Sequence, residues 1–299
     1  LLSIYMFITL FGVSLGTLLL NFSSPEKYEP FILISLLLSS ALIPILLTKR
    51  KAPKFRKLGF IDIKGLYKTS PLATVSMFCT GIIHSALFSL GAVYAATMNF
   101  TIFEISLLLF IVTVSGGIFQ WPIGYYSDKS DRRVIIILCT FLASFFAFLS
   151  IFASGSSLEN MYLATSIGID KIMFFVYVAL YAGMCVPLFT LNLAYVNDYI
   201  PKEKFVAAGA GMQMIFGIGA MTGPILCTLL MNKYGTNGFF IHLLFFHLII
   251  GSFGLYRTTK RSYKDNPEST FTPLPRNITP LGIELDPTTG ADISSTEKK

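Results

Sequence analysis

The chain alternates long apolar runs with short polar segments along most of its length. Eight of these runs approach or exceed the roughly 20 residues that an α-helix needs to cross a hydrocarbon layer about 30 Å thick. Gly and Pro interrupt several runs, which membrane helices tolerate because neighbouring helices and water satisfy the freed backbone groups. The pattern therefore predicts an all-α membrane protein with eight transmembrane helices. We place them at 1–20, 30–48, 71–97, 103–127, 133–154, 172–196, 204–231 and 237–257.

The composition agrees with a membrane location. The mean hydropathy is +0.68, hydrophobic residues make up 54% of the chain, and only 13% of the residues are charged. Soluble domains carry about 25% charged residues. A chain this apolar cannot hide its hydrophobic surface in a single core, so an ordinary soluble domain is excluded.

The basic residues predict which side of the membrane each segment faces. If the chain starts on the cytoplasmic side, the inner segments hold 17 Lys and Arg residues, whereas the outer loops hold only Lys27, Lys171 and Lys233. Positive charge collects in cytoplasmic loops, so this orientation is favoured and the C-terminus is cytoplasmic. The net charge of +7 is explained by topology and by anionic lipid headgroups. We therefore expect the lipid bilayer, and no nucleic acid, as a partner.

A short charged stretch separates the fourth and fifth apolar runs. It combines a glycine that permits close helix packing, a Ser-Asp pair able to cap a helix, and a basic cluster. We expect Asp128 either to lie at a helix N-terminus or to pair with Arg132 or Arg133, since guanidinium binds carboxylate strongly. The candidate residues are Gly124, Ser127, Asp128, Lys129, Asp131, Arg132 and Arg133.

These residues resemble the signature loop of the major facilitator superfamily, G-x-x-S-D-x-x-G-R-R, in which the charged turn acts as a conformational latch. Asp131 stands where that pattern has glycine, and Asp can enter the left-handed backbone region. In the seventh run, Gly219, Gly223 and Pro224 resemble a G-x-x-x-G-P motif of drug and metabolite antiporters. Close helix packing is the alternative interpretation, because small residues at this spacing are common in membrane helices.

The resemblance implies a major facilitator-type helical bundle with two related halves. Gly12 and Gly16 repeat the spacing of Gly219 and Gly223 at an offset of 207 residues, as expected for parallel repeats. The chain opens with Leu1 inside an apolar run, and we expect it to be an N-terminally truncated fragment. The expected parts are the last two helices of the N-terminal bundle (1–48), a basic cytoplasmic inter-bundle loop (49–70), a six-helix C-terminal bundle (71–257) and a cytoplasmic, disordered tail (258–299).

The tail carries a narrower resemblance. The segment Thr279-Pro-Leu-Gly-Ile-Glu-Leu-Asp-Pro287 looks like the ending of bacterial YcaD-like transporters, whose substrate is unassigned. The tail is too polar to span a membrane, and docking of the tail against the cytoplasmic face is a further hypothesis.

The resemblance implies a secondary active transporter that moves a small solute across the bacterial inner membrane by alternating access, as a monomer without a metal or cofactor. Proton-coupled efflux is one form of this activity. Polar residues within apolar spans are costly and usually face a cavity or another helix. The candidates for lining the path are His84, Gln120, Asn192 and Gln213. Each could instead make a hydrogen bond between helices.

Two other function classes stay open from sequence. A transporter-like sensor would share the fold, and flux would distinguish the two. A membrane-embedded enzyme is disfavoured because the sequence lacks H-E-x-x-H, a P-loop and G-x-S-x-G. The only carboxylate within a predicted span is Glu104, which lies near its outer end.

Overall fold

The structure is a computed structural model that describes residues 2–24, 26–47, 63–155, 169–201 and 204–260, with Phe271 and Pro273. Every regular element in these residues is a helix, so the all-helical prediction is confirmed. The elements are α1 (Leu2–Leu18), the 3-10 helix η1 (Leu19–Asn21), α2 (Glu29–Leu47), α3 (Ile63–Thr69), α4 (Pro71–Thr97), α5 (Ile102–Lys129), α6 (Arg132–Gly155), α7 (Ile169–Cys185), α8 (Leu188–Asn197), α9 (Phe205–Tyr234) and α10 (Asn237–Thr258).

Six predicted spans are present as helices long and apolar enough to cross a bilayer. They are α4, α5, α6, the pair α7 and α8, α9 and α10. The first two predicted spans correspond to α1, with 17 residues, and to α2, whose apolar stretch Glu29–Pro44 is also short. The count of eight spans is therefore supported for six, and membrane crossing by α1 and α2 stays a prediction.

Local sequence explains where several helices begin and end. Pro71 occupies the first position of α4, where its missing N–H is no loss. Thr101 and Glu104 form a capping box at the start of α5, with Thr101 N donating to Glu104 Oε2 at 2.8 Å. Asn99 and Gly235 have positive φ of 56° and 65°, and they terminate α4 and α9.

The predicted span 172–196 is two helices rather than one. α7 ends at Cys185 and α8 begins at Leu188. Pro187 lies between them, and a proline inside a helix removes one backbone hydrogen bond and clashes with the preceding turn. α5 packs against this break, because a Cβ on Gly116 would lie only 2.6 Å from Val186 Cβ.

α4 and α9 approach each other closely enough for their backbones to touch. A Cβ added to Gly219 would lie 2.2 Å from the carbonyl oxygen of Phe78, and one added to Gly81 would lie 2.2 Å from that of Phe216. A Cβ on Gly223 would lie 2.3 Å from the carbonyl oxygen of Ile82. These glycines let the two backbones meet, which is the packing role that small-x-x-x-small spacing serves in membranes.

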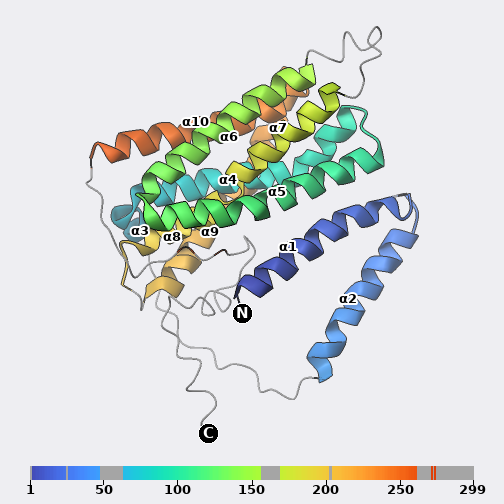
Figure 1. Cartoon of the computed structure of the whole chain (residues 1–299), viewed down its shortest axis with the longest axis horizontal. Coiled ribbons are helices and arrows are strands. Elements are labelled where there is room, and N and C mark those ends of the chain that lie inside the picture. Colours follow the sequence, from blue (N-terminus) through green and yellow to red (C-terminus); the bar gives the residue numbers. More distant parts are fainter. Residues whose placement is uncertain are drawn as a thin grey trace.

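α1 and α2 lie to one side of the six spans (Figure 1). α1 runs along α5, whereas α2 diverges from the rest of the helices. Large apolar side chains on α2, such as Phe31, Leu36 and Leu46, are exposed. In a membrane protein such a face contacts lipid or further helices, so α1 provides the main attachment of this pair to the bundle.

Parts of the predicted domain plan lie outside the described residues. The structure describes only residues 63–70 of the predicted inter-bundle loop, and these contain α3. Of the predicted tail, it describes residues 258–260, Phe271 and Pro273. The boundaries 1–48, 49–70, 71–257 and 258–299 stay predictions as domain boundaries.

Candidate functional site

The charged stretch is largely helical. α5 continues to Lys129 and α6 begins at Arg132, so only Ser130 and Asp131 connect the two helices. Asp128 consequently lies in the last turn of α5, so the helix N-terminus, one of its two expected positions, does not apply. Its partner is Arg132, because Arg132 Nη2 donates to Asp128 Oδ1 at 2.7 Å.

Arg132 joins three helices at this end of the bundle. Besides Asp128 of α5, its Nη1 atom binds Asp198 Oδ1 and donates to the carbonyl oxygen of Ala194 at 3.1 Å. Ala194 is in α8 and Asp198 caps that helix. The side chain of Arg132 is only 6% exposed, and that of Asp198 is 11% exposed. This buried cation therefore holds the ends of α5, α6 and α8 together.

Asp131 caps α6. Its Oδ1 atom accepts a hydrogen bond from the backbone N–H of Arg133 at 2.9 Å, and its carbonyl oxygen accepts from Val134 N at 2.9 Å. Its carboxylate also binds the guanidinium of Arg133, with Nη2 to Oδ2 at 2.6 Å. Asn99 is the one non-glycine residue with positive φ in the described parts of the chain, so the left-handed conformation allowed for Asp131 does not occur. The carboxylate at this position is explained by capping.

The other residues of the stretch occupy different surroundings. Ser127 is buried, whereas Lys129 is exposed and binds the hydroxyl of Tyr125 one turn earlier. Gly124 is buried beneath Phe271, because a Cβ at Gly124 would lie 2.2 Å from Cδ1 of that ring.

One face of α5 meets α1 and η1. Asn21 in η1 donates from Nδ2 to the hydroxyl of Ser106 at 2.8 Å. Gly124 follows Ser106 by 18 residues, which is about five whole turns of an α-helix. Gly124 thus lies on the face that carries Ser106, and Asp128 lies one turn further along it. The α1-facing side of α5 therefore ends at the charged turn.

Two predicted path-lining residues make hydrogen bonds between helices. His84 is 1% exposed on α4, and its Nε2 atom lies 3.2 Å from the carbonyl oxygen of Cys185 at the end of α7. Asn192 on α8 is fully buried and donates from Nδ2 to Thr80 Oγ1 of α4 at 3.2 Å. These contacts match the alternative interpretation, in which the polar groups join helices, and path lining by either residue stays a prediction.

The other two candidates lie apart from this pair. Gln120 is 6% exposed on α5. It follows Ser106 by 14 residues, which places it about 40° from the centre of the α1-facing side. Gln213 is half-buried on α9. Gln120 is therefore the candidate nearest the contact between α1 and the six spans.

The opposite end of α5 carries a simpler ion pair. Lys171 Nζ at the start of α7 donates to Glu104 Oε1 at 2.7 Å, and their side chains are 39% and 20% exposed. Lys171 also lies 5.5 Å from the centre of the Phe100 ring. This pair connects α5 with α7 at a water-accessible position.

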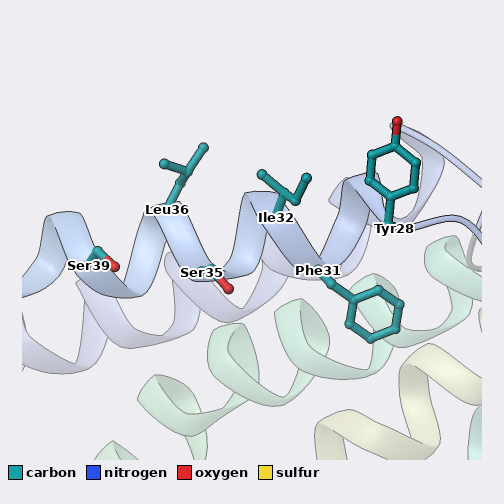
Figure 2. A pocket seen from close by; sticks show the side chains of 6 residues that line it. All are labelled: Tyr28, Phe31, Ile32, Ser35, Leu36 and Ser39. Carbon is teal, nitrogen blue, oxygen red and sulfur yellow. The ribbon is translucent and has the colours of Figure 1, made fainter.

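A groove of about 370 Å³ lies along α2, and none of these candidates lines it. Its lining residues all come from α2 and the position just before it, as Figure 2 shows. They are Tyr28, Phe31, Ile32, Ser35, Leu36 and Ser39. A groove lined by a single helix is an open face, so it offers no enclosed solute site.

In the described parts of the chain, the side chains that could bind a metal ion do not form a cluster. No group of three or more His, Cys, Asp and Glu side chains there has an arrangement that could hold a metal ion.

Two residues of the site were missed by sequence reasoning. Asp198 lies 66 residues from its partner Arg132, and Phe271 lies 143 residues from Asp128. An Asp just beyond the predicted span 172–196 was the available signal for Asp198. No local pattern distinguishes Phe271 from the chain's other aromatic residues.

Comparison with known proteins identifies the family. The model of the Major Facilitator Superfamily matches residues 1–190. The chain is 24% identical to an uncharacterized MFS-type transporter of Yersinia enterocolitica over 243 residues, which cover 81% of this chain and 59% of the relative. It is 23% identical to the uncharacterized MFS-type transporter YcaD of Escherichia fergusonii, and 21% identical to YcaD of Salmonella paratyphi B, over the same shares. The matched region thus spans 59% of these curated relatives' length.

No solved structure gives a significant match to the chain. The helical architecture, the apolar spans and the family match agree with one another, and the relatives are named as MFS-type transporters. The chain is a multi-pass membrane protein that belongs to the major facilitator superfamily.

Proposed function

We propose that the chain is part of a secondary active transporter that moves a small solute across the bacterial inner membrane by alternating access. The charged turn and the C-terminus lie on the cytoplasmic side in this proposal. The motion is a rocking of the α1 and α2 pair against the six spans, and the α1-facing side of α5 is the contact that must open and close.

The observation that supports this proposal is the position of Asp128. Its carboxylate lies on the α1-facing side of α5, where it has both a partner from α6 and room for a partner from outside the six spans. Arg132 Nη2 and Phe271 N both donate to Oδ1, at 2.7 Å each. A carboxylate that is 33% exposed can exchange hydrogen-bond donors at little desolvation cost. Asp128 thus serves as a latch that changes partners when the contact with α1 closes.

The neighbouring groups keep this latch in position. Arg132 is fixed by Asp198 and by the carbonyl of Ala194, so it presents Nη2 to Asp128 in a set direction. Gly124 leaves space one turn away for another segment to approach. Gln120 lies about two turns before Asp128 and roughly 80° from it around the axis of α5, and it is the residue that we assign first to the solute path.

The test is Asp128→Asn in the complete gene product, reconstituted in vesicles. The vesicles are loaded with the small-molecule extract of the host cell, and mass spectrometry identifies solutes that move. We expect normal membrane insertion and at least a tenfold loss of flux, since the amide carries no charge and binds guanidinium more weakly. Pyranine inside the vesicles reports whether protons move with the solute, and the side on which solute accumulates reports direction.

The matched control is Asp131→Asn. It removes one negative charge from the same turn but keeps an oxygen able to cap α6, so flux should stay within about twofold. If Asp128→Asn transports at the unmodified rate, the latch assignment is wrong. Solutes that bind the protein without moving would instead favour a transporter-like sensor.

A further inference from the structure

The strongest feature outside the proposed mechanism is the contact between Phe271 and α5. Phe271 lies 13 residues beyond the end of α10 at Thr258, yet its backbone N–H donates to Asp128 Oδ1 at 2.7 Å. Its ring packs against the hydrophobic core and is half-buried. Phe271 is therefore held on α5 by two contacts, the hydrogen bond of its N–H and the packing of its ring.

The ring of Phe271 occupies the space that a side chain at position 124 would fill, and only glycine leaves this space empty. Atoms Cδ1, Cε1 and Cγ of Phe271 would lie 2.2, 2.5 and 2.9 Å from a Cβ at Gly124. Any other residue at position 124 would displace the ring. Gly124 and Asp128 are one helical turn apart, so the ring and the N–H of Phe271 match two adjacent positions on one face.

That face is the one that α1 covers. α1 and η1 extend back from Asn21 to Leu2, and α5 extends from Ser106 to Gly124 over nearly the same number of residues. Asn21 pairs with Ser106, and the two helices run in opposite directions (Figure 1). The start of α1 is therefore level with Gly124, against which the Phe271 ring packs.

We propose that Gly124 and Asp128 form a binding site for the chain's own C-terminal segment, and that Phe271 acts there as a removable wedge between α5 and the start of α1. While the wedge is bound, the two ends cannot close on each other, and Asp128 is occupied. When Phe271 is released, Gly124 and Asp128 both become accessible. The binding site is independent of transport, whereas its inhibitory effect rests on the proposed function.

Docking is tested by the accessibility of a neighbouring thiol. Pro273 is half-buried, so Pro273→Cys is introduced into the complete gene product. The protein is purified in detergent, and the rate at which the introduced thiol reacts with a maleimide is measured. The native cysteines are buried and react slowly. We expect Phe271→Ala to raise the labelling rate of the introduced thiol about tenfold, because the segment opens more often when its contacts are lost. Gly124→Leu should raise it similarly, by filling the space that the ring occupies.

Two matched controls define the effect. Pro273→Ala changes the same segment but keeps the ring and N–H of Phe271, and it is the control in the flux assay. Gly217→Leu adds the same side chain to a helix at a glycine with nothing within 4 Å of a new Cβ. Gly217→Leu should leave the labelling rate unchanged. Equal labelling rates in the Pro273→Cys protein and its three variants would overturn the docking site.

The inhibitory effect is measured as flux in the vesicle assay with the host-cell extract. Phe271→Ala should raise the initial rate at least threefold, and Pro273→Ala should not. Faster labelling without faster flux, in a protein that transports, would refute the wedge and keep the docking site. If no variant moves any solute, the proposed function fails, while the labelling rates still decide whether the segment docks.

Discussion

The two ends of α5 hold charges in very different surroundings. At the end that faces α6, Arg132 is almost fully buried and binds groups from α5 and α8. At the other end, Glu104 and Lys171 form one pair that is partly open to water. A buried charge needs several partners because desolvation is costly, whereas an exposed pair gains little and is screened by ions. The buried cation at the first end is therefore specific in its partners, whereas the exposed pair at the second end is replaceable.

The largest effect is expected from Arg132→Met. The change keeps much of the apolar stem but leaves the buried carboxylate of Asp198 without this cation. Removing one partner of a buried pair costs about 3–5 kcal/mol. Unfolding of the purified protein in mixed detergent micelles with increasing SDS measures the loss. Arg133→Met is the control, since Asp131 is 21% exposed and can be hydrated. An equal loss in both variants would contradict the special role of Arg132.

The apolar contact between α4 and α9 gives a second loss of stability, with which that of Arg132→Met can be compared. Gly219→Val would bring a Cβ within 2.2 Å of a backbone carbonyl oxygen on α4, so α4 and α9 must separate. Overpacking of this kind costs about 1–3 kcal/mol. The same SDS titration is compared with Gly217→Val, where the space is open. If the two valines cost the same, helix propensity rather than the α4 contact is responsible.

A smaller effect is expected from Asp131→Ala. It removes the cap of α6, and loss of an N-cap costs about 1 kcal/mol. Asp131→Asn retains an oxygen that can accept from Arg133 N, so it should recover most of the stability. The unfolding midpoints of both variants check this. An asparagine variant no more stable than the alanine variant would show that charge, not capping, stabilises the turn.

The smallest effect is expected from Glu104→Gln. Glutamine can also complete a capping box with Thr101, so the change isolates the ion pair with Lys171. Exposed pairs contribute about 0.2–1 kcal/mol. Unfolding at low and high salt measures the difference, which should shrink as salt rises. A loss comparable to that of Arg132→Met, or one independent of salt, would erase the distinction between the two ends of α5.

Helix positions were largely predictable because each apolar run must by itself be long enough to cross the bilayer. This requirement can be read from each segment without knowledge of its neighbours. The third to eighth runs all became helices, and the end of α9 lies near a glycine as turn chemistry requires. The break at Pro187 was missed although its signal was present, because membrane helices often tolerate proline. The ends of α5 were misjudged, since polar Asp128 and Lys129 still extend the helix.

The candidate site was less predictable. Adjacent residues of the charged turn were recognised, and the pairing of Asp128 with Arg132 was one of the alternatives. The pairing of Arg132 with Asp198 required α6 and α8 to lie side by side, which no local pattern specifies. The cap formed by Asp131 was not anticipated, because the resemblance drew attention to the missing glycine instead of to the new carboxylate.

The sequence by itself determined the membrane class, the six long spans and the residues of the charged turn, because hydrophobic length and helix-end chemistry act over a few turns. Only the tertiary structure decided which carboxylates bind Arg132, which glycines face α4, and that Phe271 lies on Gly124. These contacts join positions far apart in the chain, and their energy is realised only after the helices have packed.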